Sequence, residues 1–353
     1  MTTLTAHISR SAARILAVAA LATCAVATSL FLPTTAAAVS KSAAWSSYGW
    51  PVKPFDRQHP IRGGFGDPRT MFWSPPTTSG VLTGDGSFTF HFGVDISAPD
   101  GTKVYPVVSG TVSTVHVDWV GVDTGDGRSF QYWHIQPAVS VGQKVEVDQT
   151  VLGSILKGQE HVHFTEIDNH RIVNPVQARH LTPYADVTKP EVDAIAFRAT
   201  DLGRDLMPNF LRGGVEMIAE AYDTPSLPVP GAWHGMPVAP ALLTWHLQTL
   251  AGREIGGTHV AVDFRRVIPP NPEFWSYYAR GTYQNMSVFK PHYSYAQPGC
   301  FLFKLTRGKF DTRSVPDGIY DLVVTAADIR GNHSSSSRRI TIHNRPGWLG
   351  AGA

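Results

Sequence analysis

The stretch GQEHVHFTEID (residues 158–168) places one histidine on each side of a single valine. Successive side chains of a β-strand point to opposite faces, so His161 and His163 would share a face, roughly 7 Å apart. Val162 would then point into a core. The stretch predicts a strand with a polar face, a pattern that two half-buried structural histidines would also produce. A metal or catalytic site needs partners from elsewhere in the chain.

A second candidate pair lies in FHFGVDISAPDG (residues 90–101), where His91 and Asp95 form an HxxxD pattern. On a straight strand the two would lie about 13 Å apart, too far for one ion with ligand bonds of about 2 Å. A helix would make them neighbours, but Gly93, Val94 and the following SAPDG are poor helix material. A bend at Gly93 is the remaining way to bring the pair together.

A third histidine, His134, follows two aromatic residues in GRSFQYWHIQPAVSVGQKV (residues 127–145). The ordered set HFGVD, SGTV, YWHI, VGQKV and HVHF resembles the lysostaphin-like, or LytM-like, zinc peptidoglycan endopeptidases. The resemblance covers roughly residues 60–176 and includes GGFGDPR (residues 63–69), which is similar to the opening segment of that family.

The resemblance implies a role for each residue of the constellation. The implied ligands of one zinc ion are His91, Asp95 and His163, and the implied catalytic histidines beside it are His134 and His161. Two positions depart from the family pattern. Glu160 stands where a small residue or proline is usual, and Thr165 intervenes before Glu166. Either departure would alter the wall of the cleft and leave the ligands intact.

The chemistry of these residue types agrees with that implication. Two imidazoles and one carboxylate leave a tetrahedral position open, which is typical of catalytic zinc and not of structural zinc. A metal-activated water could then attack an amide carbon, with a neutral histidine taking the proton and another stabilising the oxyanion. Which of His134 and His161 is the base stays open. The helical HExxH motif of other zinc peptidases is absent from the sequence.

Length and composition predict a mainly β protein of two domains. The chain has 353 residues, 16% charged and 42% hydrophobic, with 32 glycines and 26 prolines, which favours turn-rich β structure. We expect a compact antiparallel-sheet LytM-like peptidase domain and an Ig-like β-sandwich, each with its own core. The expected boundaries are a signal peptide at 1–38, an N-terminal segment at 39–59, the peptidase domain at 60–183, a linker at 184–187, the sandwich at 188–345 and a tail at 346–353.

The sandwich is expected from strand-like runs after the linker. In GIYDLVVTAAD (residues 318–328), alternate residues from Tyr320 to Ala326 are apolar or aromatic, as in a strand buried on one face. Long aromatic and proline-rich segments separate these strands. They could form a ligand surface or pack across an edge of the sandwich.

The first residues predict export. Arg10 and Arg14 precede an apolar run over residues 15–32, and small residues follow, so we expect cleavage near Ala38; a retained membrane anchor is the alternative. Cleavage would leave 28 basic and 28 acidic residues, which argues against a nucleic-acid partner. It would also leave Cys300 as the sole cysteine, so the mature chain could form no internal disulfide.

Three functions are compatible with these features. The first is a secreted zinc metalloendopeptidase acting on peptidoglycan peptides in the periplasm, the cell wall or the medium. The second is a non-cleaving LytM-like protein that binds the wall or activates another hydrolase. The third is an adhesin or carbohydrate-binding protein acting through its sandwich. No stable membrane insertion is expected after cleavage, and the sequence does not indicate an oligomeric state.

Overall fold

The computed structural model describes residues 47–72, 86–199, 203–285 and 298–345. The predicted signal peptide, at residues 1–38, lies outside them. All named strands pair in antiparallel fashion, and the described protein is mainly β, as predicted. Its few helices are single turns: η1 (Gly231–Trp233), η2 (Asn271–Glu273), α1 (Phe274–Tyr277) and η3 (Thr312–Ser314). No helix in the described ranges is long and apolar enough to span a membrane.

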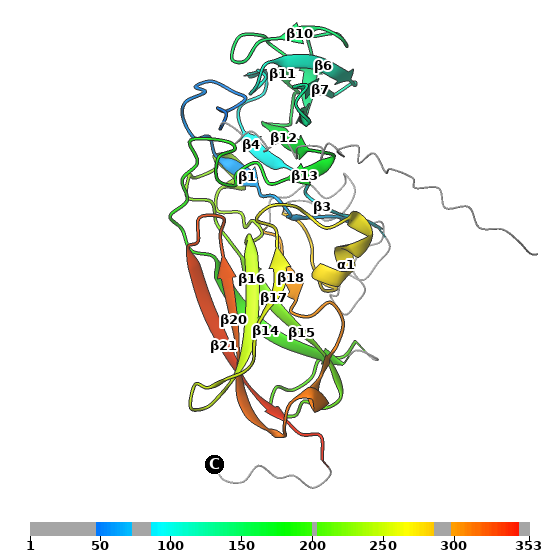
Figure 1. Ribbon diagram of the computed structural model, residues 1–353, viewed down its shortest axis with the longest axis vertical. Helices are drawn as coiled ribbons and strands as arrows, with labels where there is room; N and C mark the ends of the chain where they lie inside the picture. The colour runs from blue at the N-terminus through cyan, green and yellow to red at the C-terminus, as the bar shows by residue number, and fades with distance from the viewer. Residues whose placement is uncertain (1–46, 73–85, 200–202, 286–297, 346–353) are drawn as a thin grey trace, which may run out of the picture. The chain divides into compact units, whose positions relative to one another are not determined.

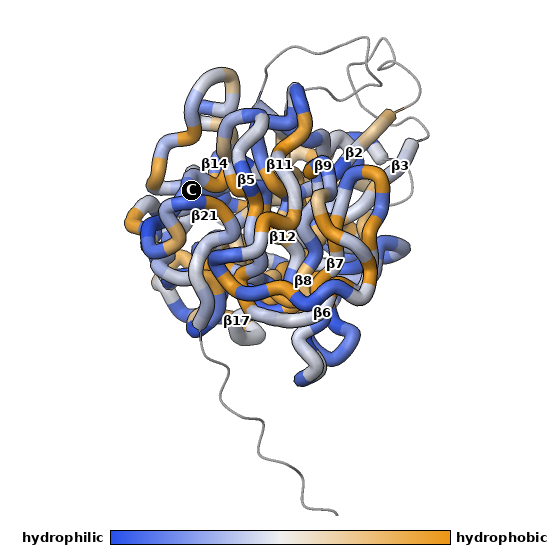
Figure 2. The backbone as a smooth tube through the Cα atoms, turned by 90° about the horizontal axis from the view of Figure 1, so that it is seen from above, coloured by the Kyte–Doolittle hydropathy of each residue, from blue (hydrophilic) through white to orange (hydrophobic). Residues whose placement is uncertain are grey.

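The N-terminal half is built on one eight-stranded sheet in which β12 is an interior strand (Figure 1). β12 pairs with β4 along one edge and with β8 along the other, and its side chains are buried on both faces, with Val162 and Phe164 on one and the histidines on the other. In Figure 2, hydrophobic stretches concentrate around β7, β8 and β12. The strands in order are β1 (Ile61–Gly63), β4 (Val94–Ser97), β12 (His161–Asp168), β8 (Arg128–Trp133), β7 (Trp119–Asp123), β6 (Gly110–Val115) and β10 (Lys144–Val145), and β13 (Arg171–Val173) also pairs with β12.

Two smaller units accompany this sheet. One is a three-stranded sheet in the order β5 (Lys103–Val104), β11 (Gly153–Ile155) and β9 (Ile135–Pro137). The other is the hairpin of β2 (Pro68–Phe72) and β3 (Gly86–Phe90). The hairpin matters for the site because its second strand leads directly into His91.

The C-terminal half contains two four-stranded sheets that contact each other across a shared core (Figure 1). Alternation along β20 follows the prediction, with Tyr320, Leu322, Val324 and Ala326 all buried. The Ig-like assignment of this region and its boundaries stay predictions. One sheet holds β14 (Glu191–Ala199), β15 (Gly214–Tyr222), β18 (Leu302–Lys304) and β19 (Phe310–Asp311), and the other holds β17 (Glu254–Asp263), β16 (Leu242–Thr249), β20 (Gly318–Ala327) and β21 (His333–Ile342).

The two halves share one hydrophobic core, which differs from the expected pair of separate cores. Phe90, which is fully buried at the end of β3, packs its ring edge-on or tilted against four aromatic rings of the C-terminal half. Its ring centroid lies 5.3 to 5.9 Å from those of Phe264, Phe274, Tyr277 and Tyr278. The physical reason is the β2–β3 hairpin, whose apolar face lies outside the main sheet and is covered by the 264–278 segment.

The described part of the N-terminal segment packs away from the histidines. The rings of Tyr48 and Phe164 are 6.0 Å apart, and Phe164 lies on the face of β12 opposite to His163. Trp50 is fully buried, and its indole N–H donates to the Pro183 carbonyl at 2.9 Å. Residues 47–59 therefore support the back of the sheet and do not cover the histidine face.

Among the described residues, Cys300 is a free cysteine. Its thiol lies 3.3 Å from a carboxylate oxygen of Glu220. Burial, followed by the charge of Glu220, raises the pKa of this thiol to about 12. The thiol is therefore protonated and poorly reactive at neutral pH.

Three buried aspartates of the C-terminal half lie close together. Asp186, Asp223 and Asp328 bring carboxylate oxygens within 4.8 Å of one another. Burial, followed by the charges of Asp186 and Asp328, raises the pKa of Asp223 to about 8. The neutral acid is therefore the favoured form of Asp223 in the folded protein below that pH.

This cluster predicts a fall in stability with rising pH. The folded pKa of Asp223 lies above the unfolded value of about 3.9, so its contribution to stability is lost as pH rises between those values. From about pH 6.5 to 8 the unfolding free energy should fall by about 2 kcal/mol, and Asp223→Asn should remove that slope. Calorimetric unfolding at several pH values measures this pH dependence of the unfolding free energy. Asp205→Asn, at an exposed aspartate, is the control. Equal slopes in wild type and Asp223→Asn would contradict the prediction.

Candidate metal centre and catalytic pocket

The chain bends at Gly93 and so brings His91 and Asp95 together. β3 ends at Phe90, β4 begins at Val94, and the bend between them falls on Gly93. A Cβ at that position would lie 2.3 Å from the Phe164 carbonyl oxygen and 2.9 Å from His163 Nε2, so the close approach requires glycine. The bend predicted from the sequence is confirmed.

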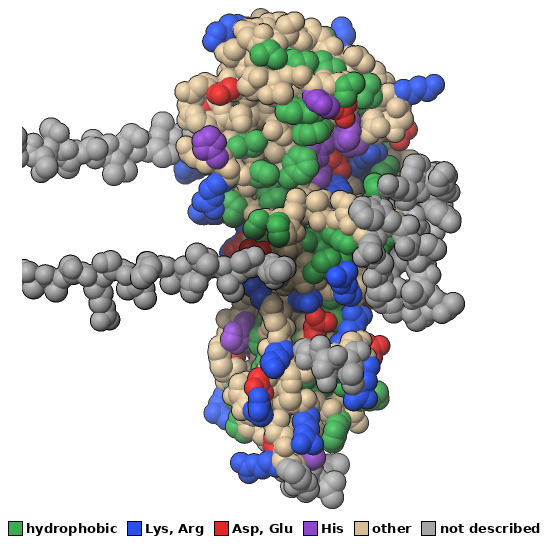
Figure 3. Space-filling model, turned by 90° about the vertical axis from the view of Figure 1, so that its right-hand side faces the viewer, with side chains coloured by type: hydrophobic (Ala, Val, Ile, Leu, Met, Phe, Trp, Pro, Cys, Tyr) green, Lys and Arg blue, Asp and Glu red, His purple; other side chains and the backbone are tan. Residues whose placement is uncertain are grey.

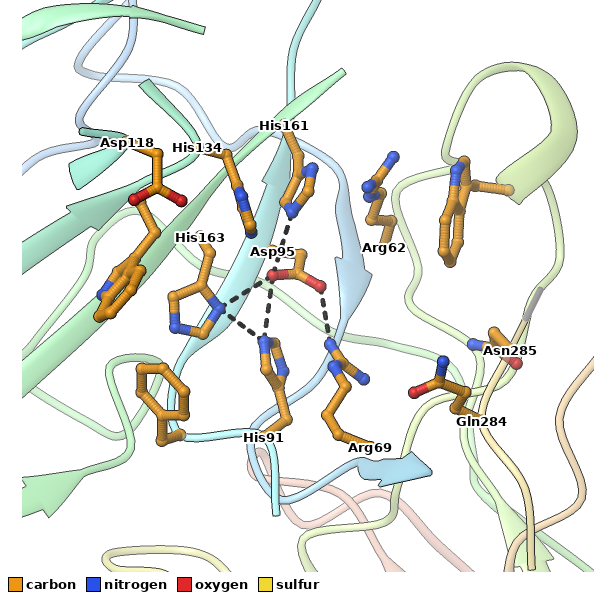
Figure 4. A pocket seen from close by; sticks show the side chains of 13 residues that line it. Arg62, Arg69, His91, Asp95, Asp118, His134, His161, His163, Gln284 and Asn285 are labelled. Carbon is orange, nitrogen blue, oxygen red and sulfur yellow. Dashed lines mark hydrogen bonds and ion pairs between the residues drawn. The ribbon is translucent and has the colours of Figure 1, made fainter. Parts of the chain in front are cut away.

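Three donor atoms converge on one point in front of β12 (Figure 4). His91 Nε2 lies 3.0 Å from Asp95 Oδ1 and 2.7 Å from His163 Nδ1. His163 Nδ1 lies 3.1 Å from the same Asp95 oxygen. The register of the sheet produces this geometry, because β12 and β4 pair with His163 directly opposite Asp95.

The far nitrogen of each imidazole is held by a hydrogen bond. His91 Nδ1 lies 2.7 Å from the Gly64 carbonyl, to which it donates, so Nε2 carries a lone pair. His163 Nε2 lies 2.9 Å from the Thr165 hydroxyl oxygen, which accepts a hydrogen bond from Nε2–H when Nδ1 is a ligand. The Thr165 hydroxyl thus positions the His163 ring.

The charge state of the cluster suits a cation. Burial lowers the pKa of His91 and lowers that of His163 to about 3, so both imidazoles are neutral. Burial alone would raise the pKa of Asp95, but its pKa is held well below the usual range, and the Arg69 guanidinium is the permanent positive charge beside it. Asp95 Oδ2 accepts from Arg69 Nη2 at 2.7 Å, which leaves Oδ1 facing the two imidazoles.

The other two predicted histidines stand beside this cluster. The ring centroids of His134 and His161 are 4.6 Å apart, and His161 Nε2 lies 3.5 Å from Asp95 Oδ1. His161 Nδ1 donates to the Gln159 carbonyl at 2.6 Å, so its Nε2 is the acceptor that faces the pocket. Burial lowers the pKa of His134 and lowers that of His161 to about 3.

The backbone at His134 is held in a sparsely populated conformation. Its φ is 65°, in the left-handed region, where the chain leaves β8 and enters β9. The His134 carbonyl accepts from Leu156 N at 2.9 Å, and the neighbouring Ile135 N donates to the Asp118 carbonyl at 3.0 Å. These two bonds hold the turn that directs the imidazole towards His161.

The five histidine and aspartate residues lie in one pocket of about 560 Å³, and all five predicted site residues are brought together. Figure 3 shows histidine side chains beside acidic and basic ones on one face of the molecule. The other residues that line the pocket were not predicted from the sequence, because no residue spacing or motif marks them. The missed lining residues are Arg62, Arg69, Phe92, Asp118, Trp133, Trp233, Gln284 and Asn285.

The cluster fits a zinc ion. Two neutral imidazole lone pairs and one carboxylate oxygen point at a common centre, and without a cation these acceptors would repel one another. Each imidazole is fixed by an outer hydrogen bond, as is usual for zinc ligands. The open side of the cluster faces the pocket and the other two histidines.

One protein-family model matches the part of the chain that contains the five site residues. Residues 89–175 match the model described as Peptidase family M23. No curated protein sequence matches the chain.

Several solved structures resemble the chain over a little more than a third of its length. A zinc containing peptidase from Vibrio cholerae is 23% identical over 38% of this chain and 41% of that chain, with a TM-score of 0.30. A mutant catalytic domain of the prophage-encoded M23 protein EnpA from Enterococcus faecalis is 24% identical, over 35% and 94% of the two chains, with a TM-score of 0.24. The SpoIIQ–SpoIIIAH pore forming complex is 21% identical, over 37% and 89%, with a TM-score of 0.28.

Proposed function

We propose that this chain, which carries a peptidase family M23 domain at residues 89–175, is an exported zinc endopeptidase that hydrolyses peptide bonds of bacterial peptidoglycan. The observation that carries the proposal is the convergence of His91 Nε2, Asp95 Oδ1 and His163 Nδ1 beside two further histidines. The proposed substrate follows from the family resemblance, and the reaction class follows from the site.

The residues of the pocket have separate roles in the proposed hydrolysis of an amide. When bound by His91, Asp95 and His163, zinc would supply Lewis-acid activation of water and of the scissile carbonyl. His161 has its Nδ1 hydrogen committed to Gln159, so its Nε2 is the group able to accept the proton of the attacking water. His134 stands next to it and can stabilise the oxyanion on the carbonyl oxygen.

Arg69 contributes by holding Asp95. Its guanidinium binds Asp95 Oδ2 at 2.7 Å and so fixes the rotamer that turns Oδ1 towards the imidazoles. The same guanidinium lies 3.7 Å from buried Asp67, whose oxygens accept from the backbone N–H groups of Gly64 and Ala239. The C-terminal half thus helps to position the ligand carboxylate, through Ala239.

Cleavage of isolated sacculi tests the proposed function. Protein beginning at residue 39 should release soluble peptides with new amino termini, detected by amino-group labelling and mass spectrometry. Exhaustive chelation should abolish the release, and added zinc should restore it. Full activity with metal shown absent would refute a zinc enzyme. Binding to sacculi without any new amino terminus would favour the non-cleaving wall-binding function or the carbohydrate-binding function.

A further inference from the structure

One cation in the pocket wall has no described anionic partner. Arg62, the middle residue of β1, is partly buried, and its guanidinium carbon lies 4.1 Å from the centre of the Trp233 ring. Its Nε is buried and lacks a hydrogen-bond partner. Among the described residues, none forms an ion pair with Arg62.

The acidic groups whose charges reach Arg62 are already engaged or exposed. Asp95 is bound by Arg69. Asp100 accepts the backbone N–H groups of Gly158 and Glu160 at 2.5 and 2.8 Å. Glu160 itself is exposed to solvent. The buried Nε of Arg62 has lost its hydration, and among the described residues the guanidinium receives in return the face of the Trp233 ring. An anion supplied by a ligand would restore the missing hydrogen bonds.

Arg62 is positioned to act on whatever occupies the catalytic pocket. Figure 4 shows it beside His161, on the side of that ring away from His163. A ligand group bound to Arg62 would therefore lie next to the amide that these histidines serve.

The planar fork of an arginine favours a carboxylate, which it binds through two parallel N–H donors. Stacking on Trp233 limits rotation of the fork, so that less conformational freedom is lost when the ligand binds. Trp233 lies in η1, 171 residues after Arg62 in the sequence. Through this contact, the C-terminal half takes part in recognising the ligand.

We propose that Arg62, held against Trp233, binds a free carboxylate of the substrate peptide next to the scissile amide. The proposal rests on the proposed function and specifies its substrate class: peptides with a carboxylate flanking the cleaved bond. That carboxylate comes either from the carboxyl terminus of the peptide or from an acidic side chain.

Binding to metal-free protein tests the carboxylate site apart from catalysis. The first probe pair is acetyl-alanyl-alanine and its carboxyl-terminal amide, and the second is acetyl-glutamyl-alanine amide and its glutaminyl counterpart. In calorimetric titrations, the acid of one pair should bind about 10- to 100-fold more tightly than its amide, the usual worth of hydrogen bonds to a charged group. The pair that shows the difference identifies the source of the carboxylate.

Three variants isolate the role of Arg62. Arg62→Gln should abolish the preference for the acid, whereas Arg57→Gln, at an exposed arginine of the same half, should keep it. Trp233→Leu should weaken the preference about threefold, because the stacking contact is lost while the charge remains. This third variant tests the site even if Arg62→Gln does not fold.

The outcomes separate this proposal from the proposed function. Equal binding of acid and amide in both pairs by wild type overturns the carboxylate site, even if sacculi are cleaved. A preference for the acid that persists in Arg62→Gln also overturns it. If wild type shows an Arg62-dependent preference and yet cleaves no sacculi, the carboxylate site stands and the peptidase function fails.

Discussion

His163→Ala is expected to empty the metal site and to abolish hydrolysis. His163 Nδ1 lies within 3.1 Å of both other donor atoms, so its loss leaves only His91 and Asp95 to hold the ion. Asp95→Ala should behave in the same way and would also leave Arg69 without its closest carboxylate. Zinc per chain, measured by atomic absorption after dialysis, should fall far below one in both variants.

His134→Ala and His161→Ala should keep their zinc and still lose turnover. Both side chains stand outside the three-atom cluster, with His161 Nε2 3.5 Å from the Asp95 oxygen. Turnover should fall by a factor on the order of 10² to 10⁴, the usual worth of a positioned base or oxyanion donor.

Thr165→Val provides a graded control for these variants. It removes the hydroxyl beside His163 Nε2 and leaves all three donor atoms in place. Zinc affinity should then fall by about 10- to 100-fold. If His161→Ala empties the site while His163→Ala keeps its zinc, the assignment of the two histidines of β12 is reversed.

A chain that ends at Pro183 is expected to lose cooperative folding. Phe90 is fully buried against four aromatic rings that all come from beyond that point. Exposing a buried phenylalanine forfeits about 1.5 to 3 kcal/mol of transfer free energy, and each aromatic pair adds about 0.5 to 1.5 kcal/mol. The sum is a large part of the roughly 5 to 15 kcal/mol by which domains are stable.

The same truncation should damage the metal centre, because Phe90 directly precedes His91. The Tyr278 hydroxyl donates to the Gly66 carbonyl at 2.7 Å, and Ala239 N donates to Asp67 at 2.7 Å. Circular dichroism melting and zinc titration measure both losses, with a chain ending at Arg345 as control. A chain ending at Pro183 that melts cooperatively and binds zinc with full affinity would show that the peptidase half folds alone.

Local sequence determined much of the site. The HxH spacing matches the two-residue period of a strand, so His161 and His163 share a face whatever the strand pairs with. The bend at Gly93 could be predicted because the neighbouring residues disfavour a helix and a straight strand would keep His91 and Asp95 too far apart. These inferences succeed because they depend on side-chain geometry within five residues, which tertiary context does not alter.

Tertiary structure alone decided what surrounds the site. Nothing in the sequence near Arg62 indicates that Trp233 covers it, or that Phe90 is buried by residues 264–278. Such contacts join segments far apart in the chain and depend on how whole sheets and loops pack, so no local period encodes them. The convergence of His91, Asp95 and His163 could therefore be expected from the sequence, whereas the charge and shape of the pocket wall follow from packing.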